Sequence, residues 1–560
     1  MKLTHKSISL SLLLSSSLLA AQAPNIADVE RNIKPPKEVE QQKSKLVDIG
    51  GVKEYKAPLK DIGGKTIFVK GFEIEGNSHI SKEKLLKKLE SFANKDLTFA
   101  DIQEVAAVIT KTYRDEGFFV SRAYIPHQDI SDSIVKIVVI EGNYGELILE
   151  NNSLIQDKIV QWLLDHAKRE NIVSTHTLER AMLIINDTPG AVVTKADVMP
   201  GREVGTSDFI IGTEATQKYD GYIIGDNYGS RYTGKNRLMV GINFNSPFKI
   251  GDKISLSGLV SQGTNLKNGR ISYAVPLMAN GLRGEFGYSH TNYSLVEEYK
   301  SLDAVGTSKA FDATFTYPII RTRLENLSAS LSFANKDLSD EIRSANDKTE
   351  KDIQNATLSF DYNLDSLLFK KYDSQTLLSF AYTYGNLDFK DSAKKLADKN
   401  GANTQGNYSK VLLTLGKKIV FTDKITLESS LKYQHSLASK NLDGSEDFSI
   451  GGSNGVKVYP DSELSAENGY LLNIEAKYKL PNIDQFSNQL GLFYDRGRAY
   501  MADNTVGFEA KSLQDIGVGY YTSYKDFFGK LQVAWTLNSD AVQSEPTSNS
   551  KVLFQGGWMF

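Results

Sequence analysis

The 560-residue chain contains no cysteine, which excludes disulfide bonds, thiolate metal sites and thiol nucleophiles. Acidic and basic side chains nearly cancel, with a formal net charge of −3, so there is no electrostatic case for binding nucleic acid. Beyond the first residues, no stretch of about eighteen apolar residues occurs, which excludes a membrane-spanning helix. The length nevertheless allows several domains.

Histidine is scarce and scattered along the chain. The seven histidines are His5, His79, His127, His166, His176, His290 and His435. None belongs to an H-E-x-x-H motif or to a close pair, the spacing that places two imidazoles on one metal ion. We therefore expect no metal site and interpret these residues as ordinary surface histidines.

Two glycine-rich stretches resemble enzyme motifs, and both fail on their surroundings. Gly229–Lys235 fits a phosphate-binding loop up to its lysine, but Asn236 replaces the hydroxyl residue that would hold magnesium, and a strand pattern follows. Gly451–Gly455 fits the G-x-S-x-G nucleophile elbow. That motif needs a following helix and a downstream histidine, whereas Pro460 follows closely and the last histidine is His435. We expect neither an enzyme nor a cofactor.

The N-terminus predicts a secretory signal over residues 1–21. Two lysines precede an apolar and serine-rich run from Ile8 to Ala21, and Ala21–Ala23 fits the small-residue cleavage rule. Because Pro24 would follow that cut, cleavage after Ala21 is an alternative. The run is too short and interrupted for a spanning helix, and a membrane anchor is the other interpretation. The mature protein is therefore expected to leave the cytoplasm.

Residues 22–65 combine a short helical pattern with a polar linker. Ile26, Val29 and Ile33 recur at helical spacing until Pro35 ends the pattern. The polar tract that follows contains two glycine pairs, which are typical of a flexible linker. A disordered tether is the alternative interpretation of the whole segment.

Residues 66–216 contain the same order of elements twice, namely strand, helix, helix, strand and strand. The first copy covers residues 66–143 and the second covers residues 144–216. Each copy predicts a small α+β domain with two helices over a short mixed sheet. The strands are expected around Phe72–Ile74, Ser121–Ile130, Ser133–Glu141, Glu146–Glu150, Ala191–Val198 and Ser207–Thr213.

Apolar residues at periods of three and four predict the helices between these strands. In the first copy they are Leu85, Leu86, Leu89 and Phe92, then Phe99, Ile102, Val105, Ala106, Ile109 and Tyr113. In the second copy they are Ile155, Ile159, Trp162 and Leu163, then Leu178, Ala181, Met182 and Ile185. Each set is expected to form the buried face of its helix.

From residue 217 the pattern changes to strict alternation, with one face suited to lipid and the other to water, as in a transmembrane β-barrel. Two examples are Leu238, Val240, Ile242 and Phe244, and Leu531, Val533, Trp535 and Leu537. About sixteen such segments fill residues 217–560, with strands of roughly ten residues and loops of about the same length, which are long for a β-sandwich. Only a closed barrel pairs every strand's backbone groups in lipid. The predicted fold is therefore an all-β transmembrane barrel of about sixteen antiparallel strands, preceded by two small α+β domains and an N-terminal helix.

The chain ends on an aromatic residue of an alternating strand. The residues on its apolar face are Val552, Phe554, Gly556, Trp558 and Phe560. This ending resembles the C-terminal signal by which outer-membrane barrels are recognised for insertion. The resemblance implies contact with the barrel assembly machinery through Trp558 and Phe560, and with outer-membrane lipid through the outer face.

Several segments of the first two domains resemble a known family. Arg114–Phe118, Ser121–Pro126 and Ile140–Gly142 resemble the polypeptide-transport-associated (POTRA) domain of two-partner secretion transporters. Asn186–Gly190 and Pro200–Asp208 are similar to that family's second such domain. The resemblance implies that both domains bind unfolded clients, for which a free sheet edge offers the means, since an extended chain can add there as a strand. Two rigid spacers are the alternative.

The resemblance continues into a glycine-rich loop of the barrel. Ile450–Gly452 and Val456–Tyr459, followed by Glu467–Tyr470, resemble the sixth loop of these transporters, which tucks into the pore. The pore-loop residues that it implies are Gly451, Gly452, Val456, Lys457 and Tyr459. Phe493–Gly497 matches the family's Phe-x-Asp-x-Gly strand motif, with Phe493, Asp495 and Gly497 as the motif residues. Alternation turns these three toward the lumen, where a tucked loop could reach the acid.

Lys457 stands where the family has arginine, and Val458 stands where it has glycine. Lysine presents a point charge and cannot make the planar bidentate bond that arginine makes to a carboxylate. We therefore expect Lys457 to meet Asp495 in a looser ion pair than is usual in the family. An extracellular loop with a solvated lysine is the alternative.

Together these resemblances identify the chain as an outer-membrane transporter of the haemolysin secretion/activation type. The family implies a large secreted partner, usually an adhesin or cytolysin, that is recognised by its N-terminal secretion domain and exported unfolded. It also implies periplasmic POTRA domains, and a pore-plugging helix that would correspond to residues 24–34. An assembly factor for other outer-membrane barrels and a passive porin remain as alternatives.

Overall fold

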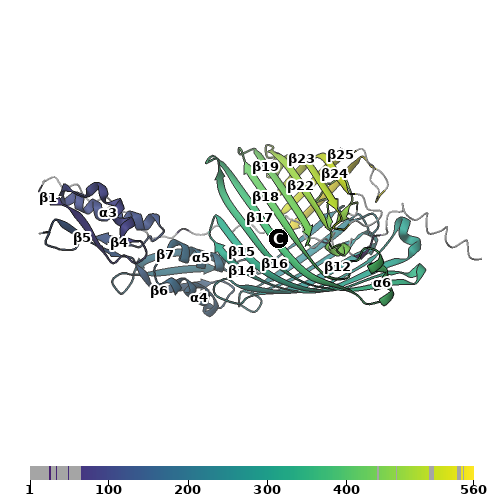
Figure 1. Ribbon diagram of the computed structural model, residues 1–560, viewed down its shortest axis with the longest axis horizontal. Helices are drawn as coiled ribbons and strands as arrows, with labels where there is room; N and C mark the ends of the chain where they lie inside the picture. The colour runs from purple at the N-terminus through teal and green to yellow at the C-terminus, as the bar shows by residue number, and fades with distance from the viewer. Residues whose placement is uncertain are drawn as a thin grey trace, which may run out of the picture.

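The computed structural model describes residues 24–26, 29, 33, 48, 65–130, 132–437, 440–461, 463–503, 510–538, 544–545 and 548–560. The predicted signal at residues 1–21 and most of the predicted linker lie outside these residues. Two small α+β units follow one another and lead to a large tilted barrel (Figure 1). Within the described part of the chain, no helix is long and apolar enough to cross a membrane.

The first unit has two helices and two small sheets. Its elements are β1 (Thr66–Val69), β2 (Gly71–Glu75), α2 (Lys82–Lys88), β3 (Lys95–Thr98), α3 (Phe99–Asp115), β4 (Arg122–Tyr124) and β5 (Ile134–Ile140). Strand β5 pairs in parallel with β2 and antiparallel with β4, while β1 and β3 form a separate pair. Helix α3 begins at Phe99 because Thr98 and Asp101 exchange capping hydrogen bonds there.

The second unit has the predicted order of strand, helix, helix, strand and strand. Its elements are β6 (Asn143–Asn152), α4 (Asp157–Asp165), α5 (Thr175–Asn186), β7 (Val192–Pro200) and β8 (Thr206–Glu214). Strand β8 is central, parallel to β6 and antiparallel to β7. Leu164, Leu178 and Phe209 are fully buried where the two helices pack on this sheet.

The small units differ from the sequence prediction in several details. The strand expected at Ser121–Ile130 shortens to β4, because Pro126 has no N–H to donate to a ladder. The β1–β3 pair was not expected. Phe99 and Trp162 are 60% and 41% exposed, although the helical period assigned both to buried faces. Phe99 is the first residue of α3, before the helix packs on the sheet, and Trp162 lies at the edge of the apolar stripe of α4.

Sixteen antiparallel strands close into a barrel, which confirms the predicted fold and strand number. They are β9 (Tyr219–Asp226), β10 (Arg237–Asn245), β11 (Lys253–Ser261), β12 (Leu266–Pro276), β13 (Arg283–Ser294), β14 (Ala304–Arg321), β15 (Glu325–Ile342), β16 (Asp347–Leu368), β17 (Tyr372–Phe389), β18 (Gly406–Val420), β19 (Ile425–Ser436), β22 (Asn468–Lys479), β23 (Ser487–Tyr500), β24 (Lys511–Tyr524), β25 (Phe527–Thr536) and β26 (Ser550–Met559). Strand β26 pairs back to β9 through Gln555–Met559. This pairing leaves the sheet without an open edge in lipid.

Alternation along each strand separates an apolar outer face from a mixed inner face. In β23, Leu490 and Leu492 are 48% and 56% exposed, whereas Phe493 and Asp495 are buried. The strands β14 to β17 have 18, 18, 22 and 18 residues, well beyond the roughly ten expected. Their additional length carries charge at the end away from the small units, where Lys390 bonds Asp352 at 2.9 Å. This part of the wall is therefore suited to water rather than lipid.

The second unit is attached to the rim of the barrel that faces it, where α5 lies beside β14 (Figure 1). Arg321 donates through Nε and Nη2 to the two carboxylate oxygens of Asp187, both at 2.7 Å. Arg180 of α5 donates to the backbone carbonyls of Asn280 and Pro318. Bidentate bonds of this kind fix orientation as well as distance, so the unit sits in a defined place against the rim.

In the first unit, the carboxylate of Glu141 accepts hydrogen bonds from three different residues. Its carboxylate accepts hydrogen bonds from the backbone N–H of Ser78 at 2.7 Å, the backbone N–H of His79 at 2.8 Å and the hydroxyl of Tyr113 at 2.8 Å. Burial alone would raise the pKa of Glu141, but the bonds from Ser78 and His79 outweigh it and lower the pKa to about 2. The carboxylate thus joins the start of α2, the end of α3 and the end of β5.

This lowered pKa predicts how acid affects the first unit. Because the folded pKa of Glu141 lies below its ordinary value of 4.5, its contribution to stability is complete above that value and is lost as pH falls toward 2. Amide hydrogen exchange of the full chain should therefore show protection in residues 66–142 falling between about pH 5 and pH 2. In Glu141→Gln, protection above about pH 5 should be lower than in wild type, and it should change less as pH falls.

The matched control is Glu116→Gln, which removes an exposed carboxylate paired with Lys84 at 2.6 Å. Exposed pairs contribute little to stability, so this variant should keep the wild-type response. An identical pH response in Glu141→Gln and wild type would show that Glu141 does not anchor the unit.

Candidate functional site

The segment between β19 and β22 folds back into the lumen of the barrel. A short pairing of β20 (Phe448–Ser449) with β21 (Ser465–Ala466) forms its neck. Beyond the neck, Ile450 and Val456 are fully buried and Tyr459 is 1% exposed. These side chains pack with lumen-facing residues of β22 to β25, so the tip of the segment, residues 450–461, lies against the inner wall. We call it the pore loop.

The tip of the pore loop is a compact turn closed by its own backbone. Val456 N–H donates to the carbonyl of Ile450 at 2.8 Å, and Gly452 N–H donates to the carbonyl of Tyr459 at 2.9 Å. Gly452 has φ +88°, and a side chain there would clash with Asp461, so glycine is required. Gly451 sits beside it in a bridge to Val456. This turn places Lys457 at the tip of the loop, away from the neck.

The ammonium of Lys457 lies inside the barrel wall. Its Nζ is 2.6 Å from Oδ2 of Asp495 and 4.3 Å from the centroid of the Phe493 ring, within the range of a cation–π contact. Asn473 Nδ2 donates to Oδ1 of the same carboxylate at 2.7 Å and to the carbonyl of Gly455 at 3.0 Å. Asp495 is fully buried, and the ammonium and the amide are its partners.

Each residue of the Phe-x-Asp-x-Gly strand motif contacts the pore loop in its own way. Phe493 presents its ring to the ammonium, and Asp495 accepts the ion pair. At Gly497, a Cβ would lie 2.8 Å from the Cβ of Ile450, closer than two carbon atoms can approach. Glycine at this position therefore lets the loop lie directly on β23.

A second carboxylate, Asp515 of β24, was not found by the sequence reasoning. Asp515 is the direct cross-strand neighbour of Asp495 and is also fully buried. Its Oδ2 accepts the backbone N–H of Val458 at 2.7 Å. The signal that could have found it is a second Asp-x-Gly in an alternating strand, Asp515-Ile516-Gly517. The loop thus places an ammonium and an N–H beside two facing acids.

Tyr459 gives the pore loop a further contact with the wall. Its hydroxyl shares a hydrogen bond of 2.7 Å with the hydroxyl of Thr536 on β25. Together with Lys457 and Val458, it connects three consecutive loop residues to the strands β23, β24 and β25. Each of these hydrogen bonds involves a side chain of the loop or of the wall, so none of them is part of a β-ladder.

The arm that leads into the pore loop is held by other strands of the wall, through charges of the reverse sign. Asp443 accepts a hydrogen bond from Lys351 of β16 at 2.6 Å. Glu446 lies 2.8 Å from Lys410 of β18 and 3.5 Å from Lys336 of β15. No local motif indicates these contacts, because their partners come from strands that are far apart in the sequence.

The described residues of the predicted N-terminal helix also lie inside the barrel. Ile26 and Val29 have helical geometry, and Val29 N–H donates to the carbonyl of Asn25 at 3.2 Å. Ile26 is fully buried and Val29 is 3% exposed, among the inward side chains of the strands. Ile26 N–H donates to Oδ1 of Asp340 on β15 at 2.8 Å. Ile33 is partly buried and lies outside the helical geometry.

At the C-terminus, Trp558 and Phe560 lie at the seam between β26 and β9. Their ring centroids are 4.7 Å apart, and Trp558 faces outward with 37% exposure. Phe560 continues the pairing beyond β26, since it exchanges backbone hydrogen bonds of 2.8 and 3.0 Å with Gly221. The last residue of the chain therefore helps to close the barrel.

Comparison with known proteins adds independent findings. The sequence model of the haemolysin secretion/activation protein ShlB/FhaC/HecB family matches residues 205–519, more than half of the chain. That of the ShlB-type POTRA domain matches residues 67–142. The chain is 28% identical over 530 residues to the heme/hemopexin transporter protein HuxB of Haemophilus influenzae strain 86-028NP, with 91% of each chain covered. It is 22% identical over 465 residues to the outer membrane transporter CdiB of Dickeya dadantii, with 80% and 79% covered.

Solved structures show the same fold. CdiB from Escherichia coli superimposes with a TM-score of 0.75 at 16% identity, covering 98% of this chain and 97% of that one. CdiB from Acinetobacter baumannii gives a TM-score of 0.65 at 16% identity, with both chains fully covered. The barrel that encloses a tucked loop, the POTRA match and the family match agree. The protein belongs to the haemolysin secretion/activation protein family, the outer-membrane transporters of two-partner secretion, whose POTRA domains lie in the periplasm.

Proposed function

We propose that this transporter keeps its lumen occupied at rest by the pore loop and the N-terminal helix, and releases them when an unfolded client enters. The observation that carries the proposal is the Lys457–Asp495 ion pair, buried at 2.6 Å in the wall of the barrel. Breaking one partner of such a pair leaves a buried charge and is costly. The loop therefore stays docked until another group supplies the charge and hydrogen bonds that it provides to the wall.

The client is a large secreted exoprotein, an adhesin or cytolysin, recognised through its N-terminal secretion domain. The first and second units act as two POTRA domains, residues 66–143 and 144–216, that receive it in the periplasm. Strands β2 and β4 are the edges of one three-stranded sheet, and β6 and β7 are the edges of the other. An extended chain can add to such an edge through backbone hydrogen bonds. Folding outside the cell gives the transport its direction.

The surroundings of the barrel fit the same proposal. The outward side chains Leu490, Leu492 and Trp535 offer an apolar face to outer-membrane lipid. Trp558 and Phe560 serve as the C-terminal signal that the barrel assembly machinery recognises. Trp558 belongs to the strand that closes the barrel and Phe560 continues its pairing, so recognition of the chain's end and closure of the sheet involve the same segment.

Deleting residues 66–143 tests whether the first unit receives the client. The barrel should still insert, because its sixteen strands close without this unit, whereas the exoprotein should disappear from the medium. Secretion is measured by immunoblot of the culture medium, and insertion by the heat-dependent mobility of the barrel on gels. Normal secretion by the deletion variant would contradict a receiving role and favour a spacer.

The pore-loop proposal predicts distinct effects for two substitutions of Lys457. Lys457→Met leaves Asp495 and Asp515 without a cation, and should weaken loop docking by about 3 kcal/mol, or about a hundredfold in the population of released loop. Lys457→Arg keeps the charge and can bond both carboxylate oxygens, so it should dock at least as firmly. Single-channel recordings in planar bilayers measure the frequency of large openings.

The control for these recordings is Lys424→Met, which removes a lysine from the exposed turn between β18 and β19. Its openings should match wild type. Asp495→Ala should reproduce the effect of Lys457→Met and impair secretion. Wild-type conductance and secretion in both variants would contradict the proposal that this ion pair holds the loop.

A disulfide between the helix and the wall tests the plug. Because the chain has no native cysteine, Ile26→Cys with Asp340→Cys forms a unique pair at a position where the Ile26 N–H reaches the Asp340 carboxylate at 2.8 Å. Oxidation should trap the helix and stop secretion, and reduction should restore it. Each single-cysteine variant is the control. Absence of the disulfide in resting cells would indicate a tether instead of a plug.

A further inference from the structure

Two arginines of β23 face outward, on the side of the strand opposite to the pore loop. Arg496 and Arg498 are both exposed, and Arg496 directly follows the buried, lumen-facing Asp495. Alternation places both arginines on the outer face that carries Leu490 and Leu492. Successive outward residues of a strand are roughly 7 Å apart, so two long side chains at this spacing can reach the same ligand.

The arginines lie toward the extracellular end of β23. The turn from β12 to β13 lies against the second unit, since Arg180 donates to the carbonyl of Asn280. Neighbouring barrel strands are antiparallel, so every second turn is at this periplasmic end, and the turn from β22 to β23 is among them. Strand β23 therefore runs outward from Ser487 to Tyr500, and the arginines come after its apolar outward residues.

The cross-strand neighbours of the arginines mark the edge of the lipid-facing band. They are Leu472 and Gln514 beside Arg496, and Tyr470 and Ser512 beside Arg498. None of these four residues is acidic. Leucine suits the acyl chains, whereas tyrosine is typical of the membrane interface. A cation on the lipid face is costly at the midplane and tolerated near the interface, so the arginines are at the level of the headgroups in the outer leaflet.

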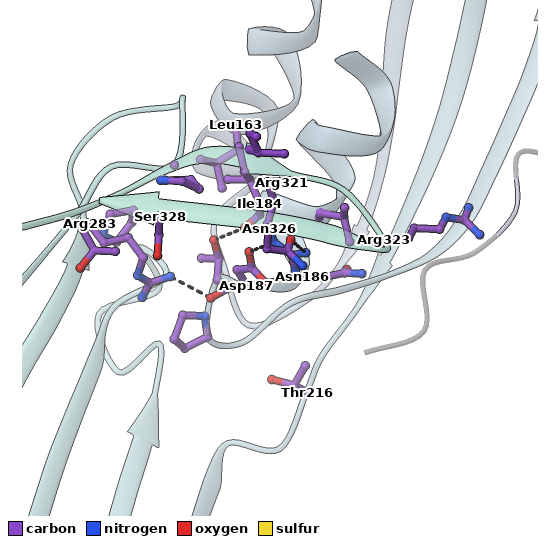
Figure 2. A pocket seen from close by; sticks show the side chains of 18 of the residues that line it. Leu163, Ile184, Asn186, Asp187, Thr216, Arg283, Arg321, Arg323, Asn326 and Ser328 are labelled. Atoms are coloured by element: carbon purple, nitrogen blue, oxygen red, sulfur yellow. Dashed lines mark hydrogen bonds and ion pairs between the residues drawn. The ribbon is translucent and has the colours of Figure 1, made fainter. Parts of the chain in front are cut away.

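The barrel contains nine arginines, and the other seven bond groups of the protein itself. Figure 2 shows two of them, where Arg321 bonds the carboxylate of Asp187 and Arg283 donates to its backbone carbonyl at 2.8 Å. The other five contact acidic side chains, and they are Arg231, Arg237, Arg270, Arg323 and Arg343. In contrast, no described residue forms a hydrogen bond or an ion pair with the guanidinium of Arg496 or Arg498.

Other cations at the extracellular end of the wall lie beside acids. Lys309 of β14 is the direct cross-strand neighbour of Asp337 on β15. Lys390, which follows β17, bonds Asp352 at 2.9 Å. These lysines are compensated by the protein, whereas the two arginines of β23 present positive charge without a carboxylate among their neighbours. Such a pair predicts an anionic ligand from outside the chain.

We propose that Arg496 and Arg498 bind a phosphate group of lipopolysaccharide in the outer leaflet of the outer membrane. The phosphate groups of its lipid A part lie between acyl chains and water, which is the level of the arginines. The planar guanidinium matches phosphate in geometry and forms charge-assisted hydrogen bonds with it. The proposal requires the position of the barrel in the outer membrane and does not require export of a client.

Gln514 offers a further donor beside the arginines. Its Oε1 accepts the hydroxyl of Tyr494 at 2.9 Å, and no described group accepts from its Nε2. Because Gln514 is the direct cross-strand neighbour of Arg496, its amide can donate to a phosphate that this arginine holds. The site thus combines two cations, a neutral donor and an adjoining apolar surface, as a phosphorylated lipid requires.

The test measures binding of fluorescently labelled lipid A to the purified full chain in detergent, by fluorescence polarisation. The double variant Arg496→Gln with Arg498→Gln should bind about a hundredfold more weakly, since a hydrogen bond to a charged group contributes about tenfold for each arginine. Arg496→Lys with Arg498→Lys keeps both charges but loses the planar bidentate bond. Its affinity should lie between those of wild type and the glutamine variant.

The matched control is Arg343→Gln, which removes an exposed arginine of the turn between β15 and β16 that lies 3.6 Å from Glu341. It should bind lipid A as wild type does. Heat-dependent gel mobility shows that each variant has a folded barrel. Because a ligand of the folded state stabilises it, lipid A should raise the unfolding temperature of wild type and of the control, and have little effect on the double glutamine variant.

Competitors identify the part of the lipid that is recognised. Unlabelled lipid A should displace the probe, and lipid A without its phosphate groups should compete at least about tenfold less well. Equal affinity of wild type and the double glutamine variant, or equal competition by the dephosphorylated lipid, would overturn the proposal. Equal competition by phosphatidylglycerol or by inorganic phosphate would assign the site to phospholipid or to free phosphate, and would also overturn it. No exoprotein is present, so failure of this test leaves the proposed export function unaffected.

Discussion

Two carboxyl groups that face each other across neighbouring strands depend on the pore loop for their partners. Asp495 and Asp515 are both fully buried in the wall, and like charges directly opposite are destabilising in a sheet. Lys457 supplies the compensating ammonium, and Val458 supplies an N–H. The wall is therefore complete only when the pore loop is docked, which makes occupation of the lumen a property of the barrel itself.

Closure of the sheet explains why the lumen needs such an occupant. The strands must pair around a full circle because lipid offers no hydrogen bonds to an open edge, and sixteen strands enclose a space wide enough for water. Two segments from distant parts of the sequence occupy this space. They are the described helix residues Ile26 and Val29 and the pore loop. Each hydrogen bond described between these occupants and the wall involves at least one side chain, while the wall is held by backbone ladders. The occupants can therefore move while the barrel stays closed.

The sequence predicted the parts of this arrangement that depend on local pattern. Strict alternation indicates which face of β23 is inward, so the meeting of Lys457 with Asp495 could be anticipated once both motifs were recognised. Asp515 was missed because its strand repeats only Asp-x-Gly and lacks the aromatic residue of the full motif. Asp443 and Glu446 could not be predicted, because their lysines come from β15, β16 and β18 and converge only after closure. The helical spacing of Ile26, Val29 and Ile33 predicted a helix, but it carried no information about Asp340, the residue of the wall that bonds Ile26.

The pore loop pairs a lysine with acids of the wall, whereas the arm that leads into it pairs acids with lysines of the wall. Withdrawal of the whole segment would therefore expose wall residues of both charges. Withdrawal of the pore loop uncovers the acids of β23 and β24, and withdrawal of the arm uncovers Lys336, Lys351 and Lys410 on β15, β16 and β18. The groups uncovered in this way include partners of both signs. A passing polypeptide of mixed charge can therefore replace the loop's contacts one at a time without being held by a uniform field. Direct exchange of ion pairs between loop and client avoids exposing all of the buried charges at once, which would be the most costly intermediate.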